Sequence, residues 1–408
     1  MRTDAKMACP LLPRLMLLIA FSAFSAIGNE QRTVPAVERM AALPEPLDVR
    51  DWRALALRYY SMVFEPSATG GGFPACQLDA TNHTFRLKSY LGNDEFQRES
   101  MTCLGAVIGM RLAGLDPRSW KAVDLAEACN AWFDPELGFY RHEPGQRDRI
   151  VHADIYGYWP AVLGMLLADL WPDDAVFVRQ RDRAIATFDA IAQSCGCPSQ
   201  PNFDVLGWDF GASRPNGRPE PMNRLSHAPT VAWALMVGAS LHGDPALAER
   251  ARAALAWQFR QQRGRYEMTF LPVAVTAARL NRLPGGAEHP LDLDAALRVF
   301  FGEYPADITT WCITSGTRCG GLTCDGLDGA RWGGGGFYAF SMGSLQGPAW
   351  LIPMVRYDPR YARAVAKYAL HAANSARLLQ GFGCRTINKT MRPGGAVTIP
   401  IVCFFTRG

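Results

Sequence analysis

Residues 231–259 read VAWALMVGASLHGDPALAERARAALAWQF, and this stretch contains the repeating unit of the predicted fold. Before the turn at Asp244-Pro245 the segment is apolar on almost every side. After the turn, apolar residues repeat every four positions from Leu247 to Phe259, with charged residues between them. A helix without a polar face is buried on all sides, whereas a helix with one apolar stripe covers a core. The stretch therefore predicts an antiparallel helix pair with one inner and one outer member.

The same turn recurs along the chain, at Asp116-Pro117 and Asp358-Pro359, with a variant that ends at Asp174. Asp accepts hydrogen bonds from the free N–H groups of the first helical turn, and Pro suits the first helical position. Repeated short turns of one kind indicate helical hairpins. The sequence predicts a lone helix at Asp51–Phe64 and hairpins near 98–132, 155–195, 226–262, 268–303 and 336–379.

Alternating buried and striped helices predict two concentric rings. The expected fold is an all-α (α/α)-toroid, a double-ring barrel of about six helical hairpins with long loops lining a central cleft. A flat solenoid is the alternative, but its repeats would be regular and these are not. We expect the toroid to occupy residues 29–380, with one partner helix unaccounted for. Residues 381–408 form an irregular tail in which Val397–Phe405 resembles a short strand.

The first 28 residues have the pattern of a signal peptide. Arg2, Lys6 and Arg14 precede an apolar run from Leu15 to Ala26, and small residues follow at the expected cleavage site. A short membrane anchor is the alternative. Since no apolar run of about 18 residues or more occurs anywhere in the chain, we expect a secreted or periplasmic protein with no membrane association after cleavage.

Charge and cysteine content restrict the function further. The net charge is +4, and +2 without the first 28 residues, which is too weak to favour nucleic acid. Of 11 cysteines one lies in the signal peptide, and the even number that remains permits disulfides in an exported chain. Cys195 and Cys197 are too close to bond to each other easily, so we expect distant partners or free thiols. A zinc site in the loop that contains Cys312, Cys319 and Cys324 is the alternative, but no CxxC pair supports it.

Candidate site residues stand where a long loop meets an apolar inner helix. Asn223, Arg224 and His227 precede one such helix and could converge on a carboxylate, although helix capping with a surface histidine is an equal alternative. Trp208, upstream in the same loop, could flank a sugar ring. His152 and Tyr156 open another inner helix, where hydrogen-bonding aromatics are not needed for packing.

A glycine-rich segment provides the remaining candidates. Arg331 and Trp332 precede four glycines and Tyr338 follows them, so the backbone can approach a ligand closely. A buried core tyrosine is the alternative for Tyr338. The acidic residues near Glu95 and Glu99 are explained by helix-dipole interactions at the start of a helix.

This set of residues suits uronate elimination better than hydrolysis. A hydrolase needs two carboxylates, but the candidates for that role can all be explained by capping or loop positions; they are Glu95, Glu99, Asp154, Asp209 and Asp325. A uronate lyase must neutralise the substrate carboxylate, for which Asn, His or Arg serve, and must move a proton, for which Tyr or His serves.

Together the export signal, the hairpin turns, the Asn-Arg-x-x-His segment and the Arg-Trp-(Gly)4-Phe-Tyr segment resemble helical-toroid polysaccharide lyases that act on glucuronan or alginate. The resemblance implies a metal-independent lyase without cofactor. It makes Tyr338 the base and acid, and Asn223, His227 and Arg331 the neutralising residues.

Substrate contacts are expected from Arg224, His152, Tyr156, Trp208 and Trp332. The partner is an acidic polysaccharide, and the sequence does not predict an oligomeric state. Many such lyases have an additional β-sandwich domain, for which this chain is too short. A glycoside hydrolase on the same toroid, or a sugar-binding toroid without activity, are the alternative functions.

Overall fold

Two of the predicted hairpins form long helices joined by a short turn. Helix α6 (Tyr158–Leu170) leads into α7 (Ala175–Ser194), and α8 (Ala228–His242) leads into α9 (Pro245–Arg260). The pair α10 (Val273–Leu280) and α11 (Leu293–Phe301) has a longer connection. Burial agrees with the predicted inner and outer members, because α6 and α8 are buried on nearly every side and α9 buries only one stripe.

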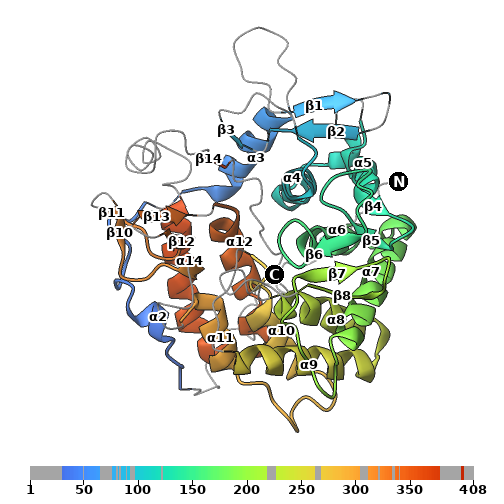
Figure 1. Ribbon diagram of the computed structural model, residues 1–408. Helices are drawn as coiled ribbons and strands as arrows, with labels where there is room; N and C mark the ends of the chain where they lie inside the picture. The colour runs from blue at the N-terminus through green and yellow to red at the C-terminus, as the bar shows by residue number, and fades with distance from the viewer. Residues whose placement is uncertain are drawn as a thin grey trace, which may run out of the picture.

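The computed structural model describes residues 30–48, 50–64, 76–79, 81, 84–88, 90–91, 97–120, 123–217, 227–261, 268–303, 311–319, 322–332, 336–339, 341–376 and 397–398. Within these ranges the chain is mostly helical, with small antiparallel sheets (Figure 1). The further helices are α2 (Pro35–Glu38), α3 (Trp52–Val63), α4 (Ser100–Ala113), α5 (Leu125–Ala128), α12 (Ser341–Leu351), α13 (Met354–Tyr357) and α14 (Ala362–Ala376).

The helices pack in two layers. In the inner layer α4 contacts α6, α6 contacts α8, α8 contacts α10, and α10 contacts α12. In the outer layer α7, α9, α11 and α14 each cover their inner neighbour α6, α8, α10 or α12 (Figure 1). The lone helix predicted at Asp51–Phe64 is confirmed as α3, which packs on α4 and is capped by the Asp51 side chain.

The four Asp turns all act as predicted. The side chains of Asp116, Asp174, Asp244 and Asp358 each accept a hydrogen bond from a backbone N–H two residues ahead. Asp174 also accepts one from the N–H of Phe177. Free N–H groups at the first turn of a helix are thereby satisfied, so the aspartates fix where each following helix begins.

An all-α fold was too strict an expectation, because strands occupy the loops between helices. The paired strands are β1 (Cys76–Asp79) with β2 (Thr84–Leu87), β3 (Tyr90–Leu91) with β14 (Val397–Thr398), β4 (Phe133–Asp134) with β5 (Phe139–Tyr140), and β10 (Arg318–Cys319) with β11 (Leu322–Thr323). Three-stranded sheets join β6 (Ile150–His152), β7 (Gly207–Asp209) and β8 (Arg214–Asn216), and β9 (Trp311–Ile313), β12 (Asp328–Trp332) and β13 (Gly336–Ala339). Where the expected strand at Val397–Phe405 is described, it is confirmed.

Two predicted helices differ from the structure. The helix expected to follow Asp116 is broken into the 3-10 turn η1 (Pro117–Ser119), α5 and the 3-10 turn η2 (Cys129–Trp132). The break arises because Trp120 is extended and Asp124 caps a new helix. The first helix of the hairpin expected near 336–379 begins only at Ser341, because residues 336–339 pair with β12 as a strand.

Residues 30–48 form a segment that we call the N-terminal strap. It crosses the outside of α11 and α14, and buries Val37 and Met40. The Arg32 N–H donates to the carbonyl of Arg360, and Nε2 of His371 lies 2.9 Å from the carbonyl of Ala41. The strap therefore connects the start of the described chain to its last long helix.

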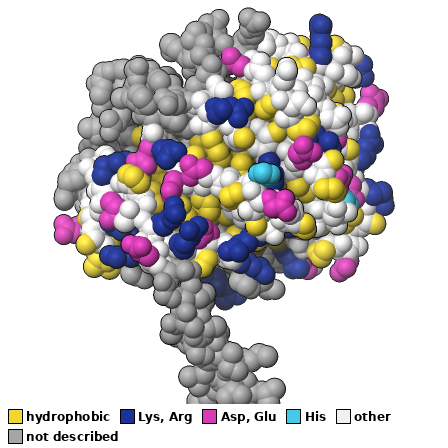
Figure 2. Space-filling model, turned by 90° about the horizontal axis from the view of Figure 1, so that it is seen from below, with side chains coloured by type: hydrophobic (Ala, Val, Ile, Leu, Met, Phe, Trp, Pro, Cys, Tyr) yellow, Lys and Arg dark blue, Asp and Glu magenta, His cyan; other side chains and the backbone are white. Residues whose placement is uncertain are grey.

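The face that Figure 2 shows has no large patch of side chains with the same charge. Basic and acidic side chains alternate there, with apolar side chains between them. Within the described part of the chain, no helix has the length and apolar character needed to cross a membrane.

Candidate functional site

His142 lies beside the first turn of α4. Its carbonyl accepts a hydrogen bond of 2.7 Å from the N–H of Ser100, which fixes the backbone. Its side chain is 14% exposed, and Nε2 lies 3.9 Å from Oε1 of Glu99. Thr102 donates to the other carboxylate oxygen of Glu99 at 3.5 Å. The start of α4 thus holds a carboxylate and an imidazole together.

Tyr156 brings a phenol to the same place. It stands just before α6, where its N–H donates to Oδ1 of Asp154 at 2.9 Å. The ring contacts His142 edge-on, with ring centres 4.8 Å apart and planes at 77°. Unlike His142, Tyr156 is 43% exposed. We call Glu99, His142 and Tyr156 the α4/α6 site.

Burial sets the charge state of this site. It lowers the pKa of His142 to about 4, so the imidazole is neutral at neutral pH. Burial also raises the pKa of Asp154 above its ordinary value, although backbone N–H groups and His152 oppose that shift. The α4/α6 site therefore combines a neutral imidazole with an accessible phenol, which are groups that can position or transfer a proton.

Sequence reasoning found Tyr156 but missed His142. The search considered residues where a loop meets an inner helix, and His142 instead follows the short strand β5. A usable signal was the position of His142 two residues after the aromatic, buried pair Phe139-Tyr140. Such a position holds a titratable side chain close to the core.

His152 is exposed at the end of β6, as a substrate-binding residue requires. Trp208 is not, because it lies opposite Val151 and Pro215 on the inward side of the sheet and is only 4% exposed. The structure therefore places His152, but not Trp208, where a ligand can touch it.

His227 lies in the interior. It is fully buried, and its ring contacts Tyr158 and Phe203 at 5.5 and 5.6 Å between ring centres. It is neither the surface histidine of the capping interpretation nor a member of the α4/α6 site. Asn223 and Arg224 lie outside the described residues.

The glycine-rich segment is described through its backbone. Tyr338 pairs with Ala330, and Arg331 pairs with Phe337, in the β12–β13 ladder. Trp332 pairs with Gly336 in the same ladder.

The other carboxylates considered for hydrolysis have local structural partners. Asp209 accepts from the N–H groups of Gly211 and Ala212, and Asp325 accepts from the N–H of Thr317. Glu95 lies outside the described residues. Across the described ranges, no group of three or more His, Cys, Asp or Glu side chains is arranged to hold a metal ion.

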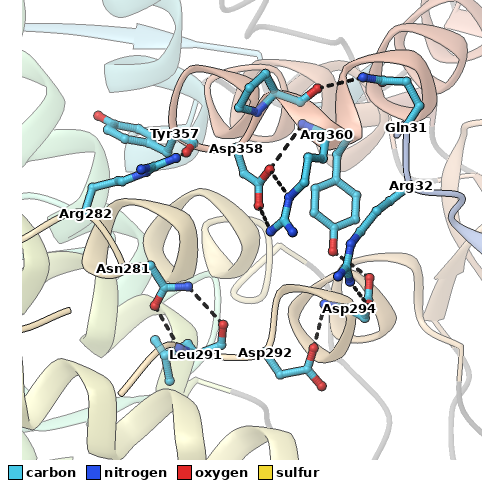
Figure 3. Close-up of polar contacts among 12 residues, drawn as sticks. Gln31, Arg32, Asn281, Arg282, Leu291, Asp292, Asp294, Tyr357, Asp358 and Arg360 are labelled. Atoms are coloured by element: carbon cyan, nitrogen blue, oxygen red, sulfur yellow. Dashed lines mark hydrogen bonds and ion pairs between the residues drawn. The ribbon is translucent and has the colours of Figure 1, made fainter. Parts of the chain in front are cut away.

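Two cavities of about 420 and 900 Å³ lie elsewhere, along the N-terminal strap. Arg32 and Arg360 line both. Figure 3 shows that these arginines point at carboxylates: Arg32 contacts Asp294 at 2.9 Å, and Arg360 contacts Asp358 at 2.6 Å. Since neighbouring carboxylates already balance the two cations, we interpret the cavities as spaces beside a structural ion-pair network.

Comparison of the chain with protein-family models, curated proteins and solved structures found no match. The functional assignment therefore depends on the residues and their geometry.

Proposed function

We propose that this protein is a secreted or periplasmic polysaccharide lyase that cleaves a uronic-acid-containing polysaccharide, such as glucuronan or alginate, by β-elimination. The supporting observation is the α4/α6 site, in which the exposed phenol of Tyr156 packs against the neutral imidazole of His142. The reaction requires a proton to leave one carbon and a proton to reach an oxygen nearby. A phenol can perform both transfers.

The proposed reaction moves one proton from C5 to the glycosidic oxygen and breaks the bond between C4 and that oxygen. Tyr156, in its deprotonated form, removes the proton on C5 of the uronate. The electron pair forms the C4–C5 double bond as the bond between C4 and the glycosidic oxygen breaks. The same phenol then protonates the departing oxygen, so the tyrosine returns to its starting form. His142 packs against the ring and orients it.

The substrate carboxylate must be neutralised for C5 to become acidic. We assign this role to Asn223 and Arg224, which precede the inner helix α8, together with Arg331. His227 is left out because its ring has no exposed surface. Tyr338, on the strand that pairs with the one containing Trp332, stays as the alternative Brønsted residue.

We further propose that the two helix layers belong to an (α/α)-toroid. The inner helices α4, α6, α8, α10 and α12 contact each other in chain order, and four outer helices cover them. Inner helices that meet in chain order, each covered by an outer helix, are expected in a double ring of hairpins. Residues 29–380 then form the catalytic domain, after a signal peptide at 1–28 and before a tail at 381–408.

One observation favours a second function, a glycoside hydrolase on the same fold. Asp154, whose pKa is raised by burial, stands two residues before Tyr156, and Glu99 is a second carboxylate at the α4/α6 site. Hydrolysis uses an acid with a raised pKa together with a second carboxylate. The backbone hydrogen bond to Asp154 makes this the weaker candidate.

The deciding experiment incubates the purified protein with glucuronan, with alginate and with a neutral glucan. Elimination predicts new reducing ends together with the ultraviolet absorbance of an unsaturated uronate, on the acidic polymers alone. Reducing ends without that absorbance would establish hydrolysis instead. No product from any polymer would refute both enzymatic functions.

A further inference from the structure

The sheet β6–β7–β8 presents one side to solvent beside the α4/α6 site. Ile150 and His152 of β6 are exposed, and Val151 between them is buried. His152 is paired with Gly207, and Gly207 in turn with Asn216. Because directly paired residues share a face, His152 and Asn216 lie on the solvent side with only a glycine between them.

Two glycines hold the backbone of His152. A Cβ atom at Gly157 would lie 1.7 Å from the carbonyl oxygen of His152, and one at Gly207 would lie 2.8 Å from its Cα. Neither position can accept a side chain without moving this backbone. The backbone that carries this exposed side chain is therefore fixed before a ligand arrives, which lowers the part of the entropic cost of binding that comes from ordering the backbone.

The spacing of the face suits one sugar ring. Neighbouring strands are roughly 4.8 Å apart, so residues on β6 and β8 are separated by about 10 Å across β7. Gly207, whose backbone is buried, puts no side chain between His152 and Asn216. An imidazole and an amide at its two sides can bond to hydroxyl or carboxylate oxygens.

The charges around the face favour an anionic ligand. Arg214 is exposed on β8 opposite Asp209, and Arg147 and Arg149 are exposed just before β6. In the described part of the chain none of these three arginines has an ion pair. The nearby acids are Asp148, Asp154, which interacts electrostatically with His152, and Asp209, and one oxygen of Asp209 already accepts two backbone N–H groups. Arginine binds carboxylates through two parallel hydrogen bonds.

We infer that the solvent side of β6–β7–β8 is a subsite for a uronate residue of an acidic polysaccharide, bounded by His152 and Asn216 and with Arg214 directed to its carboxylate. The subsite rests on the proposed function for the identity of its polymer. A uronate bound in this subsite would place the substrate chain across the sheet, with the bond to be broken at Tyr156.

The test measures binding of a size-defined glucuronan oligosaccharide by calorimetry at low ionic strength. Asn216→Ala and Arg214→Ala are each expected to weaken the Kd by about tenfold, the usual effect of losing a hydrogen bond to a charged group. Arg214→Ala should also reduce the dependence of the Kd on salt. Arg179→Ala, an exposed arginine on α7, is the matched control and should bind like the wild type.

The outcomes separate this inference from the proposed function. An unchanged Kd in both variants, or no binding by the wild type, would overturn the subsite even if unsaturated product forms. Weakened binding in a protein that yields no unsaturated product would refute the lyase and leave the subsite in place. A neutral glucan oligosaccharide that responds to Arg214→Ala as strongly as the uronate would contradict the anionic ligand.

Discussion

His142 illustrates how one buried side chain can affect both stability and chemistry. Its ring is enclosed between the start of α4 and Tyr156, and within the described residues Nδ1 has no hydrogen-bond partner. Such a ring resists protonation because a buried charge is costly. The neutral form is therefore built into the fold, and the imidazole should stay neutral over a broad pH range.

Acid should destabilise the protein partly through His142. Its pKa is about 4 in the folded state and about 6.5 when unfolded. Above pH 6.5 the imidazole is neutral in both states, so it does not change the dependence of the free energy of unfolding on pH. As the pH falls from about 6.5 to 4, only the unfolded state takes up the proton, so the folded state loses up to about 3 kcal/mol.

His142→Gln should remove the contribution of His142 to the pH dependence of the free energy of unfolding. Urea unfolding at several pH values between neutral and about 4 measures it, as the slope of the free energy of unfolding against pH. His152→Gln, at an exposed histidine, is the matched control. Equal slopes in wild type and His142→Gln would show that the imidazole is not buried as described.

Tyr156→Phe should reduce kcat by about a hundredfold or more, the usual effect of losing a general acid or base, with little change in KM. The ring is kept, so its packing on His142 should survive. Tyr338→Phe is the paired variant. If Tyr338→Phe abolishes turnover and Tyr156→Phe does not, the Brønsted residue belongs to the glycine-rich hairpin and the α4/α6 site loses its role.

At the scale of elements, the caps decide where the helices begin. Asp174 makes more interactions than Asp244, because it accepts hydrogen bonds from two N–H groups at the start of α7 and also forms an ion pair with Arg118. Asp244 at the start of α9 accepts from one. The two aspartates therefore allow a comparison between a cap alone and a cap with a charge partner.

Asp174→Ala should lower the free energy of unfolding by about 2 kcal/mol, and Asp244→Ala by about 1 kcal/mol. Urea denaturation followed by circular dichroism measures both. Arg118→Ala combined with Asp174→Ala tests for coupling of the ion pair. Identical losses for the two single variants would mean that the Arg118 pair adds nothing.

The sequence predicted well those elements that are determined by residues close together in the chain. The Asp caps and the four-residue apolar repeat from Leu247 to Phe259 depend on neighbours in the chain, so α9 and its turn followed directly. The strands did not, because β7 and β9 are short and exist through pairing with segments far away in sequence. The α4/α6 site depends on the same kind of long-range contact, which explains why Tyr156 was found without His142.

Over the whole molecule, the N-terminal strap joins parts that the helix layers do not connect locally. Arg39 contacts Glu303 after α11 and Ser315 after β9, and the N–H of Asp48 donates to Asn374 of α14. Within the strap, the Met40 side chain faces the core and is 3% exposed, whereas Leu43 is 56% exposed to solvent. The apolar face of the strap therefore completes the core on this side.

Met40→Ala should lower the free energy of unfolding by about 2–3 kcal/mol, since it removes a buried side chain. Leu43→Ala removes a similar volume from the surface and should change it by less than about 0.5 kcal/mol. Urea unfolding compares them, and hydrogen exchange of the strap reports whether it opens first. Equal effects of the two variants would show that the strap does not close the core.

The buried cysteines can serve as native probes of local unfolding. Cys76, Cys103, Cys129, Cys195 and Cys197 are free and buried, and burial raises the pKa of each; for Cys195 and Cys197 it rises to about 12. A thiol reagent reacts with the thiolate alone, so these positions are protected while the fold is closed. The order in which they become labelled would follow which regions of the molecule open first, from β1 to the end of α7, without any introduced probe.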